Sequence, residues 1–253
     1  MTFQRYVALG DSFTEGVGDP DPARPNGLRG WADRVAEVLA TRTDGFGYAN
    51  LAIRGRKLDP ILAEQLEPAL ALEPDLVTIY AGANDIMRPR VDLDALAERY
   101  DAALRRLAET GARLLVFTAF DPGGSAIYRP IRGRFALYNE LVREVADRNG
   151  ATIVDFWRMR EYRDWRYWDT DRMHMGTAGH QRMAIAVLDV LGVPHETPLP
   201  ELPPAATLTP REQRRANLAW TRSFAVPWVH RRLTGRSSGD TVSPRRPDLG
   251  PVE

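Results

Sequence analysis

Residues 6–19 read YVALGDSFTEGVGD. Four consecutive apolar residues, 6–9, are followed at once by Gly10, Asp11 and Ser12. A continuous apolar run of this length is typical of a strand that is buried on both faces of a sheet. The turn that follows would therefore deliver a serine hydroxyl to the end of a buried strand, although Gly, Asp and Ser are also common in ordinary turns.

Apolar runs and helical segments alternate along the next 180 or so residues, and five short runs stand out as strands. These runs lie at 6–9, 48–53, 76–81, 114–119 and 152–156. Between them, apolar residues recur with the 3.6-residue period of a helix, and a last helix is expected over 178–191. This alternation predicts a three-layer α/β/α fold, in which helices cover both faces of a five-stranded parallel sheet.

Polar residues follow several of the predicted strands, where the sites of such folds lie. Ser12 follows the first strand, Gly55 the second and Asn84 the third, and a loop after the fifth strand holds Asp171 and His174. Together they offer a hydroxyl, a glycine amide, a carboxamide and an Asp/His pair three residues apart. These are the groups that acyl transfer needs: a nucleophile, a general base with its orienting acid, and oxyanion donors.

Four segments of the chain resemble, in order, sequence blocks of the SGNH, or GDSL, hydrolase family of esterases and acylhydrolases. The first block is matched by ALGDSFTEGVG and the second by NLAIRGRKLD, while the third is matched by Gly82, Asn84 and Asp85. Asp171 and His174 match the Asp-x-x-His of the fifth block. The resemblance covers about residues 4–192 and implies the flavodoxin-like fold of that family.

The resemblance also implies a role for each matched residue. Ser12 would be the nucleophile, His174 its general base, and Asp171 the carboxylate that fixes the His174 tautomer. The backbone N–H groups of Ser12 and Gly55, with the Asn84 side-chain amide, would form the oxyanion hole.

Two further polar residues, Asp169 and His180, lie close in sequence to Asp171 and His174. Asp169 is a second candidate for orienting His174, because it lies in the same loop. His180 is expected to pack against or cap the last helix rather than to take part in the chemistry.

Composition excludes several classes of protein. The chain has no cysteine, and its 34 basic residues balance its 34 acidic residues, so neither thiolate chemistry nor nucleic acid binding is expected. No histidine cluster suggests a metal, and GVGDPDPARPNG lacks the third glycine of a dinucleotide site. We therefore expect no metal and no cofactor.

The sequence shows no signal peptide and no apolar run of 18 residues, which favours a cytoplasmic location.

The C-terminal quarter has a different composition. We expect the catalytic domain to span 1–195, a proline-rich linker 196–208, a basic aromatic helical arm 209–236 and a disordered tail 237–253. Thr209 and Glu212 form a capping-box pattern, and Pro227 should break or kink the arm. The arm's aromatic residues would either dock on the core or make weak contact with a membrane surface. We favour docking.

The sequence thus predicts a serine esterase that cleaves a small-molecule carboxylic ester through an acyl-enzyme. One alternative is an esterase of carbohydrate O-acetyl groups. The alternative from another class is a binding module without turnover on the same fold. The sequence identifies neither the acyl chain nor the alcohol of the substrate.

Overall fold

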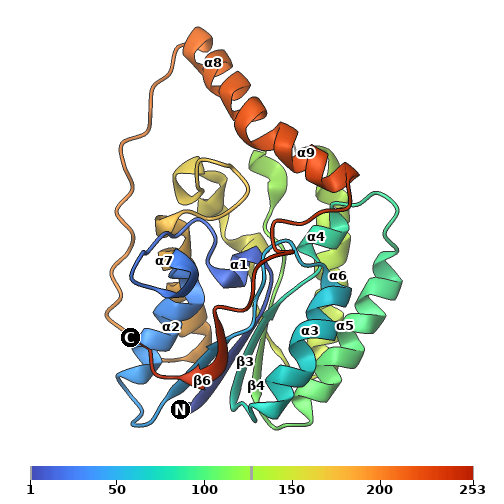
Figure 1. The fold of residues 1–253 in the computed structure, drawn as a ribbon, viewed down its shortest axis with the longest axis vertical. Coiled ribbons are helices and arrows are strands. Elements are labelled where there is room, and N and C mark those ends of the chain that lie inside the picture. Colours follow the sequence, from blue (N-terminus) through green and yellow to red (C-terminus); the bar gives the residue numbers. More distant parts are fainter. Residues whose placement is uncertain (1, 126–127, 253) are drawn as a thin grey trace.

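A computed structural model describes residues 2–125 and 128–252, and its centre is a sheet with the strand order β5-β4-β3-β1-β2-β6 (Figure 1). The strands are β1 (Arg5–Gly10), β2 (Gly47–Asn50), β3 (Leu76–Tyr80), β4 (Arg113–Phe117), β5 (Thr152–Val154) and β6 (Arg246–Gly250). The first five pair in parallel, with Val7 opposite both Ala49 and Val77. Each lies within a few residues of an apolar run that predicted it.

The sheet has six strands rather than the five that the sequence predicts, because β6 adds an antiparallel strand beside β2. The segment that forms β6, RPDLG, lies in the tail expected to be disordered, so that expectation is wrong for residues 246–250. A short polar strand with a proline is suited to a sheet edge, where one of its sides needs no partner. Its sequence carries no apolar alternation that could have predicted it.

Helices cover both faces of the sheet (Figure 1). One apolar cluster joins the sheet to α3 (Leu58–Ala71), α5 (Leu93–Ala108) and α6 (Arg132–Arg148). A second cluster joins the other face to α2 (Gly30–Ala40) and α7 (Thr177–Leu191). The three-layer arrangement is therefore confirmed. It places every loop that follows a parallel strand at the same side of the sheet, where the carboxyl ends of the strands lie.

Short helical turns lie in the loops at the carboxyl ends of the strands. They are α1 (Ser12–Glu15), α4 (Ala83–Ile86) and the 3₁₀ turns Pro25–Gly27, Pro122–Gly124, Arg129–Ile131, Phe156–Arg158, Arg160–Arg163 and Trp165–Tyr167.

The C-terminal arm consists of α8 (Pro210–Trp220), a π-helical turn (Thr221–Ala225) and α9 (Val226–Leu233). Thr209 and Glu212 form the expected capping box. Pro227 lies in the first turn of α9, directly after the π-helical turn. The proline has no N–H to donate, so the irregular turn lies where the regular helical hydrogen bonding is interrupted. The arm passes over the loops at the carboxyl ends of the strands (Figure 1). In the described ranges no helix is long and apolar enough to cross a bilayer.

Candidate active site

Ser12 occupies the first position of α1, directly after β1. Asp11 caps this helix, and its Oδ1 accepts the N–H of Phe13 at 3.0 Å. The cap explains why a strand delivers a serine here: the chain turns into a helix at once, and Ser12 sits at its N-terminus. Burial raises the pKa of Asp11 to about 7, although the Phe13 N–H and the charge of His174 act in the opposite direction.

Asp171 and His174 form a hydrogen-bonded pair in the loop before α7. Asp171 Oδ1 accepts the backbone N–H groups of Met173 at 2.8 Å and His174 at 3.0 Å, and its Oδ2 lies 2.5 Å from His174 Nδ1. An ionised carboxylate can only accept, so Nδ1 carries the proton and Nε2 is left free to act as a base. Burial opposes ionisation of Asp171, yet these hydrogen bonds and the charge of His174 hold its pKa below the ordinary value.

The two neighbouring residues take other roles. Asp169 Oδ1 accepts the backbone N–H of Thr170 at 2.7 Å, and among the described residues it is the Asp171 carboxylate, not that of Asp169, that contacts the His174 imidazole. His180 is fully buried in α7, where Nδ1 accepts the Trp31 N–H at 3.1 Å and Nε2 donates to the Val17 carbonyl at 3.1 Å. It packs inside the domain, as the sequence predicts.

The backbone N–H groups of two predicted site residues have no acceptor among the described residues. Within residues 2–125 and 128–252, neither the N–H of Ser12 nor that of Gly55 makes a hydrogen bond. Gly55 is exposed and has φ +73°, a left-handed conformation that glycine adopts without strain. Unpaired donors held at a fixed place suit an oxyanion that forms only during reaction.

The Asn84 amide is close to these donors but is occupied. Its Nδ2 donates to Asp11 Oδ2 at 2.9 Å and to the Arg56 carbonyl at 2.9 Å. Asn84 lies in α4, directly after the loop that ends β3. The two bonds tie the loops after β1, β2 and β3 together.

All five predicted site residues line one pocket of about 640 Å³. In the part of the chain that the structure describes, the Ser12 hydroxyl makes no hydrogen bond, so Ser12 and His174 share the pocket without a hydrogen bond between them. Catalytic hydrogen bonds are often long in the absence of substrate. The arm closes part of the same pocket with Phe224 and Trp228.

Sequence reasoning missed two residues that hold this site. The Glu15 side chain is fully buried and binds Arg54, the residue before Gly55. Trp220 donates its indole N–H to the Asp171 carbonyl at 2.8 Å. The arm's aromatic spacing predicted a docked face but not its target, and a glutamate in a first helical turn gives no sign that it is buried.

The structure groups no three His, Cys, Asp or Glu side chains of the described ranges so that they could hold a metal ion.

Comparison with known proteins agrees with this geometry. Residues 8–182, more than half of the chain, match the sequence profile of the GDSL-like lipase/acylhydrolase family. The chain is 28% identical over 214 residues to an acetylxylan esterase from Geobacillus stearothermophilus, covering 75% of this chain and 94% of that one.

Solved structures give the same result. A catalytic mutant of Axe2, an acetylxylan esterase from Geobacillus stearothermophilus, is 25% identical with a TM-score of 0.59, covering 76% of this chain and 96% of that one. The fold is also shared with LAE5, an α/β hydrolase enzyme from the metagenome of Lake Arreo, at 24% identity and a TM-score of 0.62, over 75% and 95% of the two chains. The chain described here therefore belongs to the GDSL-like lipase/acylhydrolase family and is a carboxylic ester hydrolase.

Proposed function

We propose that this enzyme hydrolyses its ester through an acyl-enzyme on Ser12. His174 Nε2 takes the proton of the Ser12 hydroxyl as its oxygen attacks the ester carbonyl carbon. The carbon–oxygen bond to the alcohol then breaks, and His174 returns the proton to the departing alcohol. In the second half, His174 takes a proton from water, the resulting hydroxide attacks the acyl carbon, and Ser12 leaves with its proton restored.

One observation carries this proposal. A bonded Asp171–His174 pair, the Ser12 hydroxyl and two N–H groups without acceptors line the same pocket. Asp171 stays ionised and stabilises the imidazolium that forms in each half-reaction. The N–H groups of Ser12 and Gly55 bind the oxyanion.

Asn84 completes the oxyanion hole in this proposal by exchanging one hydrogen bond. The hydrogen that points to the Arg56 carbonyl turns to the oxyanion, while the bond to Asp11 keeps the amide oriented. The hydrogen bond from Asn84 to the oxyanion forms only as charge develops in the transition state, which is the condition for raising kcat.

A carbohydrate O-acetyl ester is the second candidate substrate. The acetylxylan esterase from Geobacillus stearothermophilus supports it, because that relative is 28% identical over nearly its whole length. The remaining alternative, a binding module without turnover, loses its basis because the chain belongs to a hydrolase family.

Hydrolysis of p-nitrophenyl acetate, butyrate and octanoate, beside acetylated xylo-oligosaccharides, tests the proposal. Ser12→Ala should lower kcat by roughly 10³- to 10⁶-fold with the fold intact, as loss of a triad serine does elsewhere. Ser223→Ala is the matched control, because Ser223 lines the same pocket from the arm. Full activity in Ser12→Ala would refute the mechanism. Turnover of the sugar esters at a higher kcat/KM than the synthetic esters would favour the second candidate.

A further inference from the structure

The loop Arg54–Arg56, which carries Gly55, is held on its inner side by Glu15. Glu15 Oε2 accepts the backbone N–H of Arg54 at 2.6 Å, and Oε1 accepts the Arg54 Nε–H at 2.9 Å. The Glu15 side chain is fully buried, so this ion pair fixes the start of the loop.

The chain after the arm holds the same loop on its outer side. We call residues 237–240, SSGD, the C-terminal clasp. Ser237 Oγ donates to the Arg54 carbonyl at 3.4 Å, and Asp240 Oδ1 lies 3.5 Å from Arg56 Nη1. The clasp is itself a closed turn, since the Ser237 N–H donates to Asp240 Oδ2 at 2.8 Å.

Two glycines let the clasp and the loop approach each other closely. A Cβ atom on Gly239 would lie 2.1 Å from the Arg54 carbonyl oxygen and 2.8 Å from Cγ2 of Ile53. A Cβ atom on Gly55 would lie 2.2 Å from Ser237 Oγ. Such distances are well inside van der Waals contact, so no side chain fits between the clasp and the loop.

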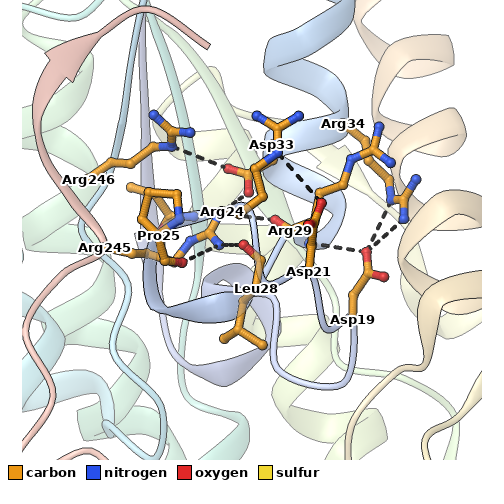
Figure 2. A network of polar contacts seen from close by, with 12 residues as sticks. Asp19, Asp21, Arg24, Pro25, Leu28, Arg29, Asp33, Arg34, Arg245 and Arg246 are labelled. Carbon is orange, nitrogen blue, oxygen red and sulfur yellow. Dashed lines mark hydrogen bonds and ion pairs between the residues drawn. The ribbon is translucent and has the colours of Figure 1, made fainter. Parts of the chain in front are cut away.

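The clasp is fixed at both ends. Before it, Trp220 is bonded to the Asp171 carbonyl. After it, the Arg245 guanidinium reaches Asp33 on α2 and the carbonyls of Pro25 and Leu28 (Figure 2). The side chains of Arg245 and Asp33 are both fully buried, and β6 follows directly. The segment between Trp220 and Arg245 is therefore held at both ends, whereas a free tail would be held at one.

We infer that the C-terminal clasp positions the N–H of Gly55 for the oxyanion, with Ser237 and Gly239 as positioning residues. The inference rests on the proposed role of Gly55 in ester hydrolysis. A donor contributes to catalysis only if its position is fixed before charge develops, and the clasp and Glu15 fix this loop from opposite sides. The match to the family profile ends at residue 182, so the clasp lies outside the matched region.

Gly239→Ala is the most direct test, and Gly250→Ala is its matched control. The added methyl group of Gly239→Ala must push on the Arg54 carbonyl, whereas at Gly250 nothing lies within 4 Å of the new atom. We expect kcat for p-nitrophenyl acetate to fall about 10- to 100-fold in Gly239→Ala with KM within about twofold, because a misplaced donor costs transition-state binding. Gly250→Ala should match the wild type in both constants.

Ser237→Ala is the second variant, with Ser243→Ala as its control, because Ser243 is exposed in the same segment. Ser237→Ala should lower kcat in the same direction as Gly239→Ala, and by less. If folded Gly239→Ala keeps the wild-type kcat or exceeds it, the clasp does not position the donor. A loss in Ser237→Ala that Gly239→Ala does not share would also overturn the inference, since the hydroxyl would then act by itself.

Amide hydrogen exchange separates this inference from the proposed function. Exchange at the backbone N–H groups of Arg54 and Arg56, which are both hydrogen-bonded, should be faster in Gly239→Ala and Ser237→Ala than in the wild type and the two controls, whatever ester is hydrolysed. Unchanged exchange there would overturn the clasp even in an active enzyme. Faster exchange in a chain that Ser12→Ala does not inactivate would instead reject the proposed mechanism and leave the clasp in place.

Discussion

The amide nitrogen of Asn84 lies 2.9 Å from Oδ2 of Asp11, the residue directly before the proposed nucleophile. A second bond, to the Arg56 carbonyl, leaves the amide with no free hydrogen in the absence of substrate. The proposed oxyanion role therefore requires one exchange of partners. Because Asp11 holds the other hydrogen, the amide can turn without leaving the pocket.

Asn84→Ala should lower kcat by about 10²- to 10³-fold and leave KM within about twofold, because the lost donor acts where charge develops. Steady-state kinetics with p-nitrophenyl acetate measures both constants. A rise in KM at constant kcat would mean that Asn84 binds the ground-state substrate instead.

Trp220→Phe should weaken catalysis through the loop that carries Asp171. The variant keeps an aromatic ring beside Arg172, which lies 5.2 Å from the Trp220 ring, but loses the N–H that binds the Asp171 carbonyl. We expect kcat to fall roughly 3- to 10-fold, less than the ~10² that a displacement of about 1 Å can cost. Trp165→Phe, at a more exposed tryptophan, is the control. Equal kcat in the two variants would show that the arm does not steady the catalytic loop.

The core of the fold and the Asp171–His174 hydrogen bond could be predicted because their signals are local. The apolar run before Ser12 carries both the strand and the turn, and Asp171 and His174 meet across three residues of one loop. The contacts that sequence reasoning missed join distant segments. Glu15 and Arg54 are 39 residues apart, and Asp33 and Arg245 are 212 residues apart. No periodicity links such pairs, so β6 and the clasp could not be predicted.

His180 should make stability depend on pH. Burial lowers its pKa from the ordinary 6.5 to about 4, and protonation of Nδ1 would break the bond from the Trp31 N–H. Between these two values the unfolded chain binds more protons than the folded one. The contribution of His180 is therefore complete above pH 6.5 and is lost as pH falls toward about 4.

Urea denaturation of wild type and His180→Gln across this range measures the effect. The free energy of unfolding of the variant should be lower than that of the wild type at pH 7, and the difference between the two free energies should narrow as pH falls. A difference that stays constant from pH 7 to pH 4 would contradict a buried neutral histidine.

Arg245→Ala should destabilise the whole domain. It removes the hydrogen-bonded partner of the fully buried Asp33 carboxylate, which then has only the more distant Arg246 guanidinium, at 3.9 Å, to balance its charge. Breaking a buried ion pair in this way typically costs about 3–5 kcal/mol. Arg5→Ala removes an exposed partner of Glu73 and should cost less than about 1 kcal/mol. Equal unfolding free energies of the two variants, measured in urea, would show that Arg245 does not anchor the C-terminal segment.

Labelling with a fluorophosphonate, followed by mass spectrometry of the peptides, tests the nucleophile most directly. Ser12 shares its pocket with Ser223, Ser237 and Ser238, so four serine hydroxyl groups line the cavity that the reagent enters. Only the one next to a general base and oxyanion donors should react rapidly. The assignment of Ser12 as nucleophile predicts a single modified residue, Ser12, and no labelling in Ser12→Ala. Modification of any of the other three serines, at the wild-type rate and with Ser12 unmodified, would contradict it.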